Sequence, residues 1–342
     1  MFRFGAVICS AITIVALLAF TAGGCQATEQ ALSNGMGQIT GKSEGAIRIP
    51  LNGDDLAIDT LGDLGYLGGL KLTSKDKDFG GLSGLLISDD GNRFLSVSDK
   101  GSWVTGKLLY RDGELIGVRE IEIAPMLGPD GQSIEGKKFG DAESLIGDLD
   151  GRVLVSFEGE PRIWAYDLSL KGFAARPTPL TLPPETRHIK NNGGLEGIAR
   201  LKDKAGTILA LTEDTYDDHG NMKGWLIRPG GSFSVSLKAI RPFKLTDLAV
   251  LPNGDVLTLE RRFTAMGGPG FQIRRIDGAT IQPGATLDGT IVANAGRPWS
   301  VDNMEGLDIR QDKTGKLVIY IVSDDNFIPL QRTLLMMFEL NE

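Results

Sequence analysis

A unit that recurs five times along the chain constrains its fold more than any other feature of the sequence. Each copy holds a short apolar strand that begins with a polar or acidic residue, a turn rich in glycine or aspartate, and a second strand that ends in an acid. The residues that open the five copies, 51 to 60 residues apart, are Ser83, Glu143, Glu196, Asp247 and Glu305. Turns such as Asp90-Gly91-Asn92 and Asn253-Gly254 have the composition of β-hairpins, so each copy predicts a pair of antiparallel strands.

The length of the repeat predicts that each copy is one blade of a β-propeller. Every interval has room for two further strands, and helical periodicity is absent. After Glu305 only three strands remain, at 307–309, 317–322 and 334–340, and residues 64–72 form a spare strand that would close the ring and cover its edges. We therefore expect an all-β fold, a single propeller of five four-stranded blades closed by an N-terminal strand. The alternative is a six-bladed ring with a degenerate blade in residues 44–60.

The N-terminus has the features of an export signal. Arg3 precedes an apolar run from Ala6 to Ala22, and small residues lead to Cys25. This arrangement resembles a bacterial lipobox, in which Cys25 would be acylated, and the alternative is ordinary cleavage near Ala27. We expect residues 1–27 to be the signal, 28–60 a tether or leader and 61–342 the propeller domain, in an exported protein that is periplasmic or lipid-anchored to the bacterial envelope.

Charge and cysteine content narrow the possible partners. The formal net charge of −8 argues against a surface for nucleic acid or anionic membranes. Cys9 lies within the signal, so the mature chain holds at most Cys25 and no disulfide can form within it. We expect a monomer that reaches a membrane only through a lipid on Cys25 and is stabilised by a large core or a bound metal.

The acids of the repeat are expected to gather at one mouth of the channel. The innermost strand of a blade begins at the mouth where the second strand ends, because a hairpin joins the two at the opposite face. The outer positions are Asp99, Glu158, Glu213, Glu260 and Asp324, so nine of the ten inner and outer positions are carboxylates. Like charges about 4 Å apart repel by about 1 kcal/mol in water and about 4 kcal/mol near a protein surface. Basic partners, raised pKa values or Ca²⁺, which favours oxygen ligands, would offset this repulsion.

Basic residues accompany the predicted ring. Lys100 follows Asp99, and Arg261 and Arg262 follow Glu260. They either pair with the acids or hold a phosphate or carboxylate group against the metal. No nucleophile elbow, HExxH or P-loop motif is present, and the chain has two histidines, so a serine triad or a zinc protease is disfavoured.

Several short phrases resemble the bacterial "esterase-like activity of phytase" propeller family, from about Leu64 to the C-terminus. They are Gly80-Gly81-Leu82-Ser83-Gly84-Leu85, Ser98-Asp99-Lys100-Gly101, Asp141-Ala142-Glu143, Asn192-Gly193-Gly194-Leu195-Glu196 and Leu259-Glu260-Arg261-Arg262-Phe263. The resemblance implies a link to propeller phytases, which use Ca²⁺ to bind phosphate and activate water.

The resemblance, taken with the acidic ring, implies a Ca²⁺-dependent hydrolase of phosphate esters, with a small anionic substrate. The acids would hold one or more Ca²⁺ ions, and Lys100, Arg261 and Arg262 would bind the phosphate. The ring also resembles that of calcium-dependent lactonase propellers, and a third possibility is a binding module in which the metal is purely structural.

Overall fold

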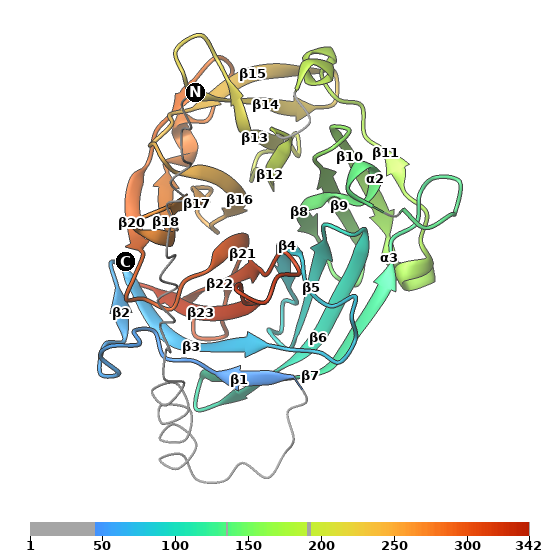
Figure 1. The fold of residues 1–342 in the computed structure, drawn as a ribbon. Coiled ribbons are helices and arrows are strands. Elements are labelled where there is room, and N and C mark those ends of the chain that lie inside the picture. Colours follow the sequence, from blue (N-terminus) through green and yellow to red (C-terminus); the bar gives the residue numbers. More distant parts are fainter. Residues whose placement is uncertain (1–44, 135, 190–192, 342) are drawn as a thin grey trace, which may run out of the picture. The chain divides into compact units, whose positions relative to one another are not determined.

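Five sheets form a ring in the computed structural model (Figure 1). It describes residues 45–134, 136–189 and 193–341. The predicted export signal with Cys25, and the predicted leader up to residue 44, lie outside these residues. No helix within the described ranges has the length and apolar character needed to cross a bilayer.

Each sheet corresponds to one repeat, and the chain adds strands from the channel outwards (Figure 1). Blade 1 consists of β4 (Leu82–Ile87), β5 (Arg93–Ser98), β6 (Ser102–Arg111) and β7 (Glu114–Pro125). Blade 2 consists of β8 (Ala142–Gly147), β9 (Arg152–Phe157), β10 (Arg162–Asp167) and β11 (Thr178–Pro179). Blade 3 consists of β12 (Leu195–Arg200), β13 (Ile208–Tyr216), β14 (Met222–Arg228), β15 (Gly231–Leu237) and the short edge strand β19 (Thr286–Leu287).

The last two blades complete the ring. Blade 4 consists of β16 (Lys244–Val250), β17 (Val256–Thr264), β18 (Gly268–Ile276) and β20 (Thr290–Ala295). Blade 5 consists of β21 (Asn303–Gln311), β22 (Leu317–Asp324), β23 (Leu334–Leu340), β3 (Leu64–Leu72), β1 (Ala46–Arg48) and β2 (Thr60–Leu61). Short helical turns lie in the connections: α2 (Lys137–Gly140), α3 (Leu168–Lys171), η1 (Gly172–Ala174), η2 (Pro184–His188) and η3 (Gly278–Thr280).

The N-terminal strand closes the ring, as the sequence predicted. β3 pairs antiparallel with β23, from Leu64 opposite Leu340 to Lys71 opposite Leu334. This pairing covers the edge that the last repeat would leave exposed. The five-bladed prediction is confirmed, and no sixth blade lies in the described part of residues 44–60, because Ala46–Arg48 instead pairs with the outer edge of β3. The fifth sheet thus begins inside the segment that we assigned to the leader.

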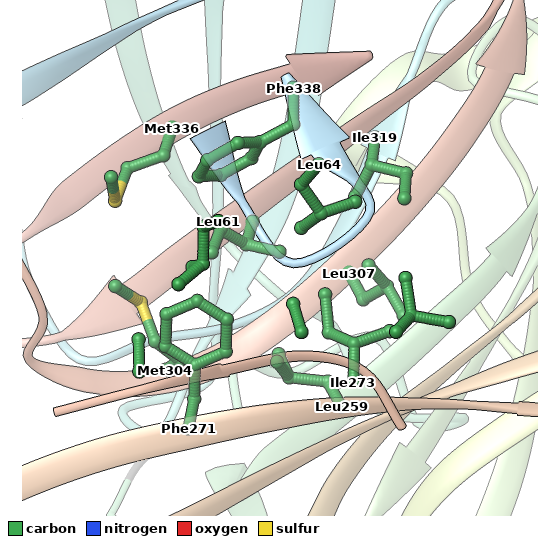
Figure 2. Close-up of a cluster of buried hydrophobic side chains, with 14 of the residues drawn as sticks. Leu61, Leu64, Leu259, Phe271, Ile273, Met304, Leu307, Ile319, Met336 and Phe338 are labelled. Atoms are coloured by element: carbon green, nitrogen blue, oxygen red, sulfur yellow. The ribbon is translucent and has the colours of Figure 1, made fainter. Parts of the chain in front are cut away.

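The apolar core is divided among the interfaces between neighbouring blades. Five buried clusters occupy the five interfaces of the ring. Figure 2 shows the cluster between blades 4 and 5, where Phe271 and Ile273 of β18 face Met336 and Phe338 of β23. Both phenylalanines are at most 1% exposed, and burying such a side chain contributes about 1.5–3 kcal/mol. Each blade therefore depends on its two neighbours for stability.

Every innermost strand carries a β-bulge at the same place. The inner strands contact one another in ring order, and the register to the second strand shifts by one residue near the start of each inner strand. A bulge places two residues opposite one and changes the direction of the first side chain. The first residues of the bulges are Ser83, Glu143, Glu196, Thr246 and Glu305, and the second are Gly84, Ser144, Gly197, Asp247 and Gly306.

The second bulge residues meet where neighbouring inner strands approach most closely. A Cβ atom on Gly306 would lie 2.7 Å from the carbonyl carbon of Gly84, and one on Gly84 would lie 2.9 Å from the backbone nitrogen of Leu145. Side chains at these two glycines would collide with the next strand. In blades 2 and 4 this position instead holds Ser144 and Asp247, and their side chains join the strands.

Asp247 connects three blades through hydrogen bonds. Its Oδ1 accepts from Ser144 Oγ at 2.7 Å and from its neighbour Leu248 N at 2.9 Å, and its Oδ2 accepts from Leu307 N at 2.7 Å. Ser144 Oγ in turn accepts from Ile198 N of blade 3 at 3.3 Å. Burial raises the pKa of Asp247 well above its usual range. Two side chains therefore tie together the inner strands of blades 2 to 5.

We expect Asp247→Asn to lower the free energy of unfolding by about 1–3 kcal/mol, because one acceptor oxygen becomes an amide NH₂ and leaves a buried donor unmatched. Chemical denaturation monitored by circular dichroism measures the change. Asp218→Asn, at an exposed position, is the control and should change stability by less than about 0.5 kcal/mol. Equal stability of the two variants would contradict a linking role for Asp247.

Candidate metal and anion site

A cavity of about 870 Å³ collects most of the predicted ring residues. Its carboxylates are Asp99, Asp141, Glu143, Glu158, Glu196, Glu213, Asp302, Glu305 and Asp324, and its basic residues are Arg261, Arg262, Arg297 and Arg332. Ser83 also lines it, as do Asn303 and Asn326, while Asn191 and Asn192 lie outside the described residues. Eight of the ten predicted ring positions therefore meet in one cavity.

Two predicted metal ligands, Asp247 and Glu260, do not line this cavity. Asp247 is the second residue of its bulge, so Thr246 takes the place that a glutamate has in blades 2, 3 and 5. In the neighbouring strand, Glu260 pairs with Leu245, and the residue equivalent to Glu213 is Arg261. Both assignments were wrong by one residue, because the nearest acids in the sequence were matched to the repeat without knowledge of the bulge.

The carboxylate of Glu260 is used inside blade 4. It accepts from Thr258 Oγ1 at 2.8 Å, Gln272 Nε2 at 2.7 Å and Arg274 Nε at 2.5 Å. The side chains of Glu260 and Arg274 are both fully buried. A buried charge needs such partners, so Glu260 has a structural role within blade 4.

The three basic residues predicted to bind phosphate have three different environments. Arg261 lies among the acids, with Nη2 at 3.0 Å from Glu213 Oε1 and Nε at 2.8 Å from Glu305 Oε1. Arg262 lines the cavity, and its Nη1 lies 3.4 Å from the carbonyl oxygen of Gly268. Lys100 is not part of the cavity lining, and its Nζ lies 3.2 Å from the centre of the Phe327 ring. Arg261 neutralises the acids, and of the three only Arg262 remains available for an anion.

Two groups of three carboxylates could each hold a metal ion. In the first, Asp141, Glu143 and Glu158 have ligand atoms within 4.8 Å of one another, and in the second Glu158, Glu196 and Glu213 do. Glu158 belongs to both. We call these two overlapping groups the paired triads. Asp141 was absent from the predicted ligands, although it precedes Glu143 by two residues, because the other repeats have no acid at that position.

The local backbone of blades 2 and 3 brings the paired triads together. Glu143 and Glu196 are the second residues of the bulged strands β8 and β12, whereas Glu158 directly follows β9 and Glu213 lies within β13. Gly194 is required for this approach, since a Cβ atom there would lie 2.6 Å from the Cα of Glu158. The missing side chain of Gly194 therefore makes room for Glu158.

Two glutamates of the paired triads have strongly raised pKa values. Burial, followed by the charges of Asp141 and Glu305, raises the pKa of Glu143 well above its usual range. Burial, followed by the charges of Glu143 and Glu213, does the same for Glu196, which is 5% exposed. No hydrogen bond to the carboxylate of Glu143 or Glu196 is present within the described ranges. These two groups need either protons or a cation.

Three further acids of the cavity, Glu158, Glu305 and Asp324, have pKa values raised to near neutrality. Burial and the charge of Asp141 raise the pKa of Glu158 to about 7. Burial raises the pKa of Glu305 to about 8, although Arg261 acts in the opposite direction. Burial also raises the pKa of Asp324 to about 7. The metal-free cavity therefore takes up protons at a pH where ordinary carboxyl groups are ionised.

We expect the metal-free protein to become less stable as the pH rises from 5 to 8. A carboxyl with a raised pKa binds more protons in the folded than in the unfolded state, so stability is lost between its ordinary pKa of 4.5 and its raised value of about 7 for Glu158. Melting curves in excess chelator measure this slope, and Ca²⁺ should raise the melting temperature more at pH 8 than at pH 5.

The variant Glu158→Gln should flatten this slope, because it removes one titrating group from the paired triads. Glu185→Gln is the control, since Glu185 is exposed and outside the cavity. A metal-free protein whose melting temperature is constant or rises from pH 5 to pH 8 would contradict the account of these charges.

Comparisons with known proteins agree with the fold and identify the family. An α-L-arabinofuranosidase from Podospora anserina, solved in complex with cellotriose, is 12% identical with a TM-score of 0.52, over 82% of this chain and 98% of that chain. A hypothetical protein from Leishmania major is 8% identical with a TM-score of 0.43, over 79% of this chain and 89% of that chain. The first likeness concerns the fold alone, and the second is too weak to carry an argument. No curated protein matches the sequence.

The family described as phytase-like, "Esterase-like activity of phytase", matches residues 77–327. This range includes the inner strands of blades 1 to 5 and all the carboxylates that line the cavity. The resemblance seen in the sequence is thereby confirmed, and the chain belongs to the phytase-like family of β-propellers.

Proposed function

We propose that this protein is an exported, Ca²⁺-dependent hydrolase of phosphate esters that acts at the acidic cavity. The proposal rests on the paired triads. Their five carboxylates come from two adjacent blades, and the two triads have Glu158 in common. All five carboxylates line a cavity that arginines also line. The family description, which refers to phytase, supports the choice of phosphate esters. The composition of residues 1–27 supports export.

The ligand set fits Ca²⁺ better than a softer metal. All candidate donors in the paired triads are carboxylate oxygens, which suit hard cations. Neither His188 nor His219 lines the cavity, so the imidazole ligands typical of zinc and copper sites are missing from it. The carboxylates of the half-buried Glu143 and the buried Glu196 accept no hydrogen bond from a described residue, and a divalent cation would satisfy them. Asp141, Glu143, Glu158, Glu196 and Glu213 would hold one or two such ions.

The arginines of the cavity would bind the anionic group of the ester. Arg297 is exposed, and neither it nor Arg262 makes an ion pair with any described residue. Arg262 Nη1 lies 3.4 Å from the carbonyl oxygen of Gly268, and its guanidinium group lies 5.6 Å from the centre of the Phe243 ring. Arg332 is held in place by Asp302, with Nε at 3.0 Å from Oδ2. Guanidinium groups match the oxygen geometry of phosphate, so these side chains would position the ester against the paired triads.

The acids outside the paired triads would act as proton donors. A bound Ca²⁺ would withdraw negative charge from the phosphoryl oxygens. Glu305, with a pKa of about 8, and Asp324, with a pKa of about 7, can hold a proton on a carboxyl oxygen near neutral pH. Either group can then donate that proton to the oxygen of the departing alcohol. Arg261 keeps Glu305 in position through its contact at 2.8 Å.

We expect Glu196→Gln to weaken Ca²⁺ binding at least about 10-fold, because the amide keeps the shape of the side chain and removes one charge from the second triad. Calorimetric titration of the full chain measures the affinity. Phosphate release from a phosphate monoester should fall at low Ca²⁺ and recover in part when the Ca²⁺ concentration is raised. Glu185→Gln, outside the cavity, should leave both quantities unchanged.

Two results would contradict the proposed function. Undiminished phosphate release in excess chelator would remove the metal from the reaction. Tight Ca²⁺ binding without phosphate release from any ester tested would instead assign the paired triads a non-enzymatic role.

A further inference from the structure

Large apolar side chains are strongly exposed around the cavity. Among the described residues, four such side chains are more than 70% exposed: Leu170 at 86%, Phe263 at 72%, Met266 at 99% and Leu330 at 92%. Phe263 and Leu330 line the cavity, and Met266 lies in the connection that follows Phe263. Exposed apolar groups that gather at a cavity commonly mark a binding surface.

Six apolar residues line the cavity. We call them the apolar wall, and they are Phe263, Pro269, Trp299, Val301, Ile328 and Leu330. All six come from blades 4 and 5 or from the connections between and within them, whereas the paired triads come from blades 2 and 3. The candidate cation sites and the apolar groups of the cavity therefore come from different blades, and blade 5 and the connection before it also contribute Asp302, Glu305 and Asp324.

The charges of the cavity limit how many anionic groups it can accept. Nine carboxylates line it, against four arginines. Arg261 is paired with Glu213 and Glu305, and Arg332 is paired with Asp302. Only Arg262 and Arg297 remain without an ion pair among the described residues, and two guanidinium groups suffice for one phosphate. A second anionic group on the substrate would face the repulsion of the acids.

Resting on the proposed function, we infer that the substrate is a phosphate ester with a single anionic group and an apolar alcohol, such as an aryl or alkyl phosphate. The phosphate lies between the paired triads and Arg262 and Arg297, and the apolar alcohol covers the apolar wall. Burial of that group removes Leu330 and Phe263 from water and supplies the affinity that a polyanionic substrate would lose to repulsion.

The test compares two phosphonates that bear the same anionic group and are not hydrolysed. Phenylphosphonate and methylphosphonate are titrated calorimetrically into the full chain saturated with Ca²⁺, and the fluorescence of Trp299 in the apolar wall gives a second readout. We expect phenylphosphonate to bind about 10-fold more tightly, since a partly buried ring gains roughly that factor over a methyl group.

Two leucines of similar exposure provide matched variants. Leu330→Ser should lower the affinity for phenylphosphonate about 3-fold or more and leave that for methylphosphonate unchanged. Leu170→Ser, on α3 and away from the cavity, should change neither affinity. A loss of affinity that is equal for the two phosphonates in Leu330→Ser would contradict an apolar subsite.

The outcomes separate this inference from the proposed function. If both phosphonates bind equally to the unaltered protein, the inference is wrong while a phosphate site remains. If neither phosphonate binds in the presence of Ca²⁺, the anion site of the proposed function fails and the inference fails with it. If Leu330→Ser reduces binding to phosphatidylcholine vesicles and leaves the phenylphosphonate affinity unchanged, the apolar wall faces a lipid surface and the inference is overturned.

Discussion

The close approach of the five inner strands determines most of what this protein can be. Their bulges leave so little space that glycine occupies three of the five second positions, at Gly84, Gly197 and Gly306. The other two positions hold Ser144 and Asp247, which bond to each other at 2.7 Å. Because the inner strands are joined at this level, the first residues of the same bulges are fixed in direction, and those of blades 1, 2, 3 and 5 gather in one cavity. The acidic site is thus a consequence of how the channel is packed.

The gathered acids oppose the stability of the fold that positions them. Burial and mutual repulsion raise the pKa values of Glu143, Glu158 and Glu196, so each costs free energy when it is ionised in the metal-free protein. Arg261 relieves part of this cost by contacting Glu213 and Glu305. The carboxylates of Glu143 and Glu196 have no ion pair with any described residue. A divalent cation in the paired triads would neutralise their remaining negative charge.

The sequence alone predicted the number of blades and the closing strand, because both follow from counting strands between repeats. It also placed eight of ten ring residues in the cavity. It failed in blade 4, where Asp247 and Glu260 each lie one residue from Thr246 and Arg261, which occupy the equivalent ring positions. A bulge leaves no mark on the composition of a strand, so a one-residue offset between similar motifs cannot be seen without the register.

Other features of the site depend on contacts between segments far apart in the chain. Asp141 joins the first triad because blade 2 begins with an additional acid, which the repeat did not contain. Lys100 was expected at the cavity, but the ring of Phe327, from the connection after β22, holds its ammonium group at 3.2 Å. Neither outcome could be derived from the order of residues within one repeat, since each involves a partner outside it or a departure from it.

The departure of blade 4 from the repeat makes the cavity chemically asymmetric. If its bulge had placed an acid where Thr246 lies and another where Arg261 lies, the ring would approach five-fold symmetry, with repulsion spread evenly around the channel. With Arg261 in that position, the two candidate metal-binding groups lie in blades 2 and 3, and the residues of blades 4 and 5 add arginines and apolar groups to the acids that they contribute. A symmetric acidic ring can bind a cation at the axis, but it offers an organic anion no preferred orientation. The asymmetry introduced by one basic residue allows a metal, an anionic group and an apolar group to occupy separate sides of the same cavity.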